Sequence, residues 1–125
     1  MRYRVALAVL AALTASISAP AGAQDAVEGE KVFKRQCFVC HTATAEGANK
    51  QGPKLFGIIG RKSGSVDGFR YTDANKNANI VWTAETLDPY LLDPRKVVPG
   101  TTMAFAGLRK EEDRKNLIAY LLTLK

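Results

Sequence analysis

Residues 37–41 are Cys-Phe-Val-Cys-His, and they contain both cysteines and the single histidine of the 125-residue chain. Two cysteines three positions apart and followed at once by histidine are typical of covalent haem attachment. There the thiols add to the haem vinyl groups and the imidazole binds the iron. On a helix end, residues three apart share a face, so one porphyrin can reach all three side chains. The motif predicts attachment of one haem c through Cys37 and Cys40, with His41 as an axial ligand.

Two other chemistries use a similar pair of cysteines. A redox dithiol of the thioredoxin type is expected near a βαβ pattern, and this chain shows no strand periodicity. A structural zinc site needs four ligands, whereas the chain has no second cysteine pair and no second histidine. The five-residue pattern could also arise by chance. An export signal and a loop-rich chain, described below, fit haem better than these alternatives.

Met103 is the only methionine after residue 23, and it follows Pro99-Gly100-Thr101-Thr102 in a stretch without helical periodicity. A lone methionine usually packs in a core. With a haem present and no second imidazole in the chain, we expect its thioether to be the second axial ligand. Histidine and methionine together fill both axial positions and raise the reduction potential, which favours an electron carrier over an enzyme.

Residues 1–23 have the pattern of an export signal. Two arginines precede an apolar run over residues 5–13, and small residues at 21–23 precede the expected cleavage site. The alternative is a membrane anchor, but polar residues from Thr14 onward interrupt the run before the roughly 20 apolar residues that a bilayer span needs. We expect cleavage to leave one domain, residues 24–125, in the bacterial periplasm.

The formal net charge is +6, from 18 Lys and Arg against 12 Asp and Glu. Arg2 and Arg4 would leave with residues 1–23, which lowers the formal charge of the remaining chain by two, to +4. Nucleic-acid binding is not expected, because the basic residues are interleaved with acidic ones and no cluster of aromatic side chains is visible.

Capping and periodicity predict three helices, over residues 26–37, 83–92 and 110–123. Asp25 and Thr83 are the predicted caps of the first two, and the second helix should stop before Asp93-Pro94. Pro89 lies inside that second helix, where we expect a kink or a late start. An apolar stripe at i, i+3, i+4 and i+7 in the last helix can pack on the first.

Residues 42–81 are rich in glycine and polar side chains, and we predict loops there with at most short helical turns. Residues 93–107 are predicted to form another irregular stretch, with a turn at Pro99-Gly100. Loops of this length are uncommon in a compact domain, so a large apolar cofactor is expected to organise them. The sequence therefore predicts an all-α domain with long ordered loops.

From about Gly29 to Lys125 the sequence resembles class I cytochrome c, both the mitochondrial protein and bacterial relatives of the cytochrome c2 type. The matching segments include Gly52-Pro53-x-Leu55-x-Gly57, Gly60-Arg61-Lys62-Ser63-Gly64, Gly68 to Asn77, Pro99-Gly100-Thr101-x-Met103, and Leu117 to Leu121. This resemblance implies the cytochrome c fold, in which the terminal helices cross and long loops wrap around one covalently attached haem.

The resemblance also implies roles for further residues of a haem site. The carbonyl of Pro53 would accept the second ring N–H of His41 and orient the imidazole. The residues implied to hold the haem propionates are Arg61, Tyr71, Trp82 and Thr101. Those implied near the methionine sulfur or the exposed haem edge are Tyr90, Asn75 and Phe105. Gly29 and Tyr120 match the close crossing of the terminal helices.

Together with the export signal, the resemblance implies one-electron transport by a soluble periplasmic protein, expected to be a monomer, from a cytochrome bc complex to a terminal oxidase or a photosynthetic reaction centre. A basic docking rim for acidic partner faces would comprise Lys31, Lys50, Arg95, Lys96, Arg109 and Lys110. An ordinary solvated surface is the other interpretation of these cations. The alternative function is a haem-based peroxidase or small-ligand sensor with a labile methionine ligand.

Overall fold

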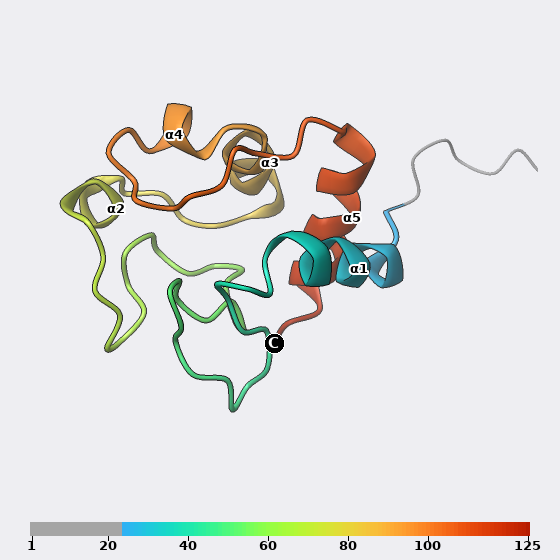
Figure 1. Ribbon diagram of the computed structural model, residues 1–125, viewed down its shortest axis with the longest axis horizontal. Coiled ribbons are helices and arrows are strands. Elements are labelled where there is room, and N and C mark those ends of the chain that lie inside the picture. The colour runs from blue at the N-terminus through green and yellow to red at the C-terminus, as the bar shows by residue number, and fades with distance from the viewer. Residues whose placement is uncertain (1–23) are drawn as a thin grey trace, which may run out of the picture.

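A computed structural model describes residues 24–125. The helices of this part are α1 (Ala26–Gln36), α2 (Asp73–Asn77), α3 (Ala84–Leu92), α4 (Pro94–Val97) and α5 (Glu111–Leu122). Long loops join them (Figure 1). Within residues 24–125 the only strand-like pairing is an isolated bridge between Lys62 and Val81. The export signal predicted for residues 1–23 lies outside the described residues. In the described part, no helix is long and apolar enough to cross a membrane.

The two terminal helices cross at a glycine. A Cβ on Gly29 of α1 would lie 1.9 Å from the backbone oxygen of Asn116 and 2.8 Å from the Cβ of Tyr120, both on α5. The ring of Phe33 packs against Tyr120 at 5.5 Å between centroids, and the Asp25 N–H donates to the Asn116 side chain at 3.0 Å. The predicted crossing of α1 and α5 is therefore confirmed, and only a residue without a side chain fits at the contact.

Helix α3 begins where the sequence predicts. The Thr83 hydroxyl accepts the N–H of Thr86 at 3.2 Å, and the Thr86 hydroxyl accepts the N–H of Thr83 at 2.8 Å, which completes a capping box. Pro89 lies within the helix without delaying its start, and its carbonyl still accepts the Asp93 N–H at 3.1 Å. The late start considered for this helix is therefore wrong.

Residues 94–97 are helical, so the loop predicted over residues 93–107 is wrong for this turn. The Asp93 side chain accepts the N–H of Lys96 at 3.2 Å, and Pro94 occupies the first helical position, where its fixed φ favours a helix. The same Asp-Pro pair thus ends α3 and starts α4. Helix α1 stops at Gln36, one residue earlier than predicted, with Cys37 as its C-cap.

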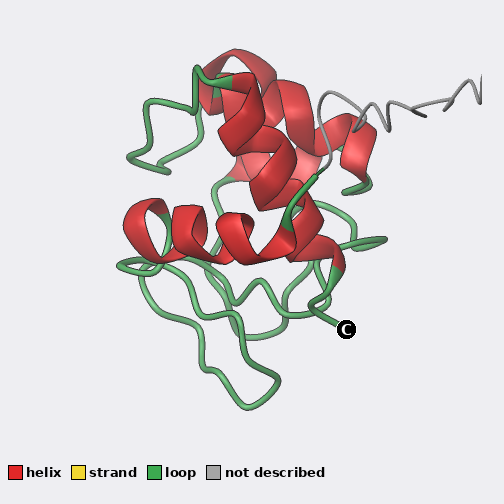
Figure 2. Ribbon diagram, turned by 90° about the vertical axis from the view of Figure 1, so that its right-hand side faces the viewer, coloured by secondary structure: helices red, strands yellow, loops and turns green. Residues whose placement is uncertain are grey.

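The core lies between the helices and the loops, which Figure 2 shows gathered mostly on opposite sides of the molecule. Leu87 and Leu91 of α3 and Leu117 and Leu121 of α5 are almost fully buried, and all of them also line the pocket described next. Leu117 and Leu121 of the predicted apolar stripe on α5 therefore pack in the core and also line the pocket.

Candidate functional site

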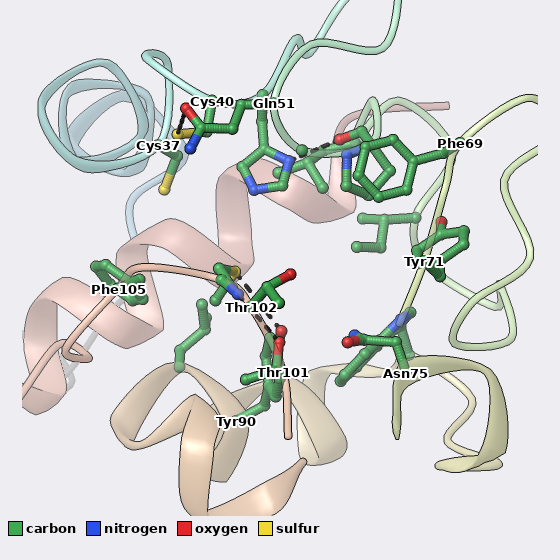
Figure 3. A pocket seen from close by; sticks show the side chains of 18 of the residues that line it. Cys37, Cys40, Gln51, Phe69, Tyr71, Asn75, Tyr90, Thr101, Thr102 and Phe105 are labelled. Carbon is green, nitrogen blue, oxygen red and sulfur yellow. Dashed lines mark hydrogen bonds between the residues drawn. The ribbon is translucent and has the colours of Figure 1, made fainter. Parts of the chain in front are cut away.

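One pocket enters the core between the end of α1, the loop that follows it, α3 and the loop before α5. Every residue that the sequence predicted for the site lines this pocket: Cys37, Cys40, His41, Pro53, Arg61, Tyr71, Asn75, Trp82, Tyr90, Thr101, Met103 and Phe105. Figure 3 shows Cys37 and Cys40 at one side of the pocket and Tyr90, Thr101 and Asn75 at the other. Side chains from separate segments between positions 37 and 105 thus line a single cavity.

The cysteine motif forms a tight turn at the end of α1. The Cys37 carbonyl accepts the backbone N–H groups of Cys40 at 3.0 Å and His41 at 2.9 Å, so the three side chains of the motif are held on one turn. Both thiols are free and half-buried. Burial raises the pKa of the Cys37 thiol to about 11, and the Cys40 sulfur donates to the Gln51 side-chain oxygen at 3.7 Å (Figure 3).

The His41 imidazole is fixed by its backbone neighbours. Its Nδ1 lies 2.6 Å from the Pro53 carbonyl oxygen. Since a carbonyl can only accept, Nδ1 carries the proton and Nε2 keeps a free lone pair. Burial lowers the pKa of His41, although the Pro53 contact raises it in part, so the ring is neutral at neutral pH. The geometry that the resemblance implied for Pro53 is present, and it leaves Nε2 available to a metal.

Met103 lies in the loop before α5, as predicted, and its sulfur has one polar neighbour. The Tyr90 hydroxyl donates to the Met103 sulfur at 3.6 Å. Burial raises the pKa of Tyr90 to about 12, so this hydroxyl keeps its proton. The Met103 backbone N–H donates to Thr101 at 3.3 Å. A second lone pair on the sulfur remains for a soft metal.

The two polar residues implied near the sulfur differ in their contacts. Tyr90 makes the hydrogen bond to Met103, and its ring also packs on Trp82 at 4.6 Å between centroids. The Asn75 side-chain oxygen instead accepts the Thr72 hydroxyl at 2.8 Å, although Asn75 also lines the pocket. Tyr90 is therefore the direct partner of the thioether.

Among residues 24–125, Arg61 is a cation without a carboxylate partner. Its guanidinium donates to the carbonyl of Lys54 at 2.8 Å and to the carbonyl of Phe56, and within residues 24–125 no carboxylate forms an ion pair with it. Burial lowers the pKa of Arg61, which means that its charge is incompletely solvated. Tyr71 lies close enough to interact with it electrostatically, and its hydroxyl accepts the Val66 N–H at 3.1 Å. This donor set suits the carboxylate groups of a haem.

Gly52 is a site residue that the sequence analysis did not predict. A Cβ there would lie 2.4 Å from Cε1 and 2.7 Å from Nδ1 of His41, closer than any real Cβ contact. The imidazole can lie against the backbone only because residue 52 has no side chain. The Gly52-Pro53 pair was the available signal, since a glycine beside the orienting proline indicates a close approach. Further pocket residues that sequence reasoning missed include Gln51, Phe69, Arg70 and Thr72.

The basic residues of the predicted docking rim are all exposed. Lys31 pairs with Glu28 at 2.6 Å and Lys110 with Glu112 at 3.3 Å, so part of the rim's charge is neutralised locally. Lys50 lies over the Phe38 ring at 4.4 Å and donates to the Phe38 carbonyl. Arg95, Lys96 and Arg109 have no ion pair within the described residues.

The residues present fit a haem better than the alternatives. Across residues 24–125, no group of three or more histidine, cysteine or acidic side chains could hold a metal, and no βαβ unit accompanies the cysteines. An apolar pocket with two free thiols, a neutral imidazole and a thioether, together with an unpaired arginine, matches an iron porphyrin carrying two carboxylates. The fold and site define a c-type haem protein with candidate axial ligands from histidine and methionine.

Comparison with known proteins agrees with this class. A family model described as cytochrome c matches residues 26–125, and the chain belongs to the cytochrome c family. Cytochrome c of Theileria annulata is 56% identical over 97 residues, covering 78% of this chain and 84% of the relative. Cytochrome c2 of Blastochloris viridis is 52% identical over 109 residues, covering 87% and 84%. The chain is therefore an electron carrier with one haem c, attached through Cys37 and Cys40.

Proposed function

We propose that this cytochrome c is a periplasmic one-electron shuttle, with His41 and Met103 as its axial ligands, and that it is not an enzyme. When bound, the haem supplies an iron that takes up and releases single electrons. The observation that carries the proposal is that two side chains suited to iron line one pocket and each is held by its own partner. Pro53 holds His41 and Tyr90 holds Met103. With His41 and Met103 both bound, the iron would have no free position for a substrate.

The surrounding side chains tune and seal this site. His41 keeps its proton on Nδ1, and the Pro53 carbonyl increases the basicity of Nε2. The Tyr90 hydroxyl withdraws electron density from the sulfur of Met103. Buried apolar residues such as Leu87 and Leu117 exclude water from the pocket, and a low-dielectric surrounding disfavours an extra charge on the iron. Methionine ligation, the Tyr90 hydrogen bond and the low-dielectric surrounding favour a high reduction potential, whereas the more basic Nε2 of His41 opposes it.

The location of the protein is inferred from its N-terminal sequence pattern, and its redox partners are inferred from its surface charge. Residues 1–23 match an export signal, which supports cleavage before Gln24 and a periplasmic location. The exposed cations Arg95, Lys96 and Arg109 would steer the protein to acidic faces of a cytochrome bc complex and of its acceptor, an oxidase or a photosynthetic reaction centre. Association of this kind is transient and becomes slower as salt screens the charges.

Carbon monoxide separates the carrier from a peroxidase or ligand sensor. The reduced holoprotein at neutral pH should bind carbon monoxide slowly and incompletely, because the Met103 thioether must leave first. Prompt stoichiometric binding would defeat the methionine assignment and favour an open-site enzyme or sensor. The chain variant Met103→Ala serves as the positive control, since it removes the thioether and should bind at once.

Two further measurements test location and acceptor. Expression of the full chain in a bacterium should yield a holoprotein beginning at Gln24 in the periplasmic fraction, and retention of residues 1–23 would contradict export. Reduced protein added to membranes of the source organism can then be compared in darkness with oxygen and under flash illumination without oxygen. Oxidation in only one of these conditions identifies an oxidase or a reaction centre as the acceptor.

A further inference from the structure

Arg114 of α5 is a buried cation that joins three parts of the fold. Its side chain is 8% exposed, and its Nε donates to Asp88 of α3 at 2.8 Å. One terminal nitrogen donates to the carbonyls of Leu108 and Arg109, each at 2.9 Å. A single guanidinium therefore connects α5, α3 and the C-terminal end of the loop that carries Met103. Figure 1 shows this loop passing across α3 before it enters α5.

Backbone contacts attach the same end of the loop to α3. The Leu108 N–H donates to the Leu91 carbonyl at 2.7 Å. Gly107 has a φ of 101°, and a Cβ there would lie 2.0 Å from the Leu92 carbonyl oxygen. On the same helix, Tyr90 donates to the Met103 sulfur. Helix α3 thus holds the thioether directly and holds the loop beyond it through the contacts of residues 107 and 108.

We propose that Asp88 is a positioning residue for Met103, acting through Arg114. The ion pair fixes the end of the Met103 loop on α3 and so keeps the thioether in place against external ligands. This rests on the proposed function, in which Met103 is an axial ligand. With a neutral amide at position 88, the buried guanidinium loses its ion pair to α3 and keeps only neutral oxygen acceptors, so its bond to the helix becomes weaker. The loop then separates more easily from the helix that carries Tyr90.

The test is displacement of the thioether by imidazole from the ferric holoprotein at a fixed neutral pH. The variant is Asp88→Asn, which preserves size and removes charge. Its matched control is Asp113→Asn, which removes the carboxylate that pairs with Arg35 at 3.8 Å between α5 and α1, away from the Met103 loop. Loss of the weak far-red absorption of the thioether–iron bond reports displacement. We expect about tenfold tighter imidazole binding in Asp88→Asn, the effect of one partly exposed charge-assisted hydrogen bond, and less than about twofold in the control.

Denaturant midpoints of both variants separate positioning from general stability. Tighter imidazole binding by Asp88→Asn alone, with return toward the parent affinity in Asp88→Glu, supports the proposal. Equal affinities of the two variants would overturn it, as would an affinity that follows the denaturant midpoint in both. If the parent protein lacks the far-red absorption, Met103 is not the ligand and the proposed function fails first. If that absorption is present and Asp88→Asn binds imidazole as the parent does, the ligand assignment stands and only the positioning role fails.

Discussion

Replacement of Gly52 by alanine tests whether the His41 imidazole requires a residue without a side chain at position 52. The added Cβ would lie 2.4 Å from Cε1 of His41 and within 2.8 Å of both ring nitrogens, where real contacts are absent below 3.0 Å. The ring or the backbone at residues 52–53 must therefore move. That movement would distort the hydrogen bond of 2.6 Å between Nδ1 and the Pro53 carbonyl.

The size of the effect follows from two costs. Overpacking in a well-packed site costs about 1–3 kcal/mol. Weakening of the Pro53 hydrogen bond adds about 1 kcal/mol. We expect Gly52→Ala to lower the free energy of unfolding of the ferric holoprotein by about 2–4 kcal/mol, measured by chemical denaturation. The reduction potential should rise in a redox titration, because an imidazole with a weaker Nδ1 bond is a poorer donor to the ferric iron.

Gly60→Ala is the matched control for Gly52→Ala. Gly60 has a φ of 85°, and a Cβ there would meet no atom within 4 Å, so alanine adds backbone strain without a steric contact. We expect a cost of about 1 kcal/mol and no change in potential. If Gly52→Ala unfolds at the parent denaturant concentration, or costs no more than Gly60→Ala, the contact with His41 does not explain the glycine.

Three other substitutions probe the site, the crossing and the surface. Tyr90→Phe removes the donor to the Met103 sulfur and should lower the reduction potential, since the thioether becomes more electron-rich; an unchanged potential in a redox titration would contradict this. Gly29→Ala places a Cβ 1.9 Å from the Asn116 carbonyl oxygen and should lower the free energy of unfolding, measured by chemical denaturation, by about 3 kcal/mol. A loss below about 1 kcal/mol would show that α1 and α5 can move apart to accept the methyl group at little cost. Lys96→Glu should slow oxidation by partner membranes at low salt and leave the haem spectrum unchanged, and a parent-like rate would exclude this part of the rim from docking.

Local signals in the sequence were sufficient for much of the fold and for the candidate ligands. Asp25 and Thr83 are short polar residues before apolar periodic segments, and both cap helices as predicted. His41 and Met103 stood out because each is the only side chain of its kind in the predicted mature chain. To predict that both side chains line one pocket, the only further signal needed was the length of the loops, which a large cofactor would organise.

Contacts between distant segments could not be predicted in the same way. The Arg114 pair with Asp88 joins residues 26 positions apart, and in the sequence Arg114 resembles an ordinary solvated residue in a charged first turn. Helix α4 was missed because an Asp-Pro pair signals both the end of one helix and the start of the next, and only the backbone path decides between them. Gln51 gave no signal, since an amide near a cysteine sulfur has no characteristic spacing.

The tight crossing of α1 and α5 makes the two ends of the domain a single cooperative unit. Asp25 and Asn116 bond across 91 positions, and Gly29 brings the helix backbones into direct contact, so neither helix can unwind while the other keeps its packing. Slowly exchanging amide hydrogens of the two helices should therefore exchange with a shared opening free energy, above that of the long loops. Cys37 directly follows α1, so we expect the haem attachment point to lie in the part of the described domain that opens last.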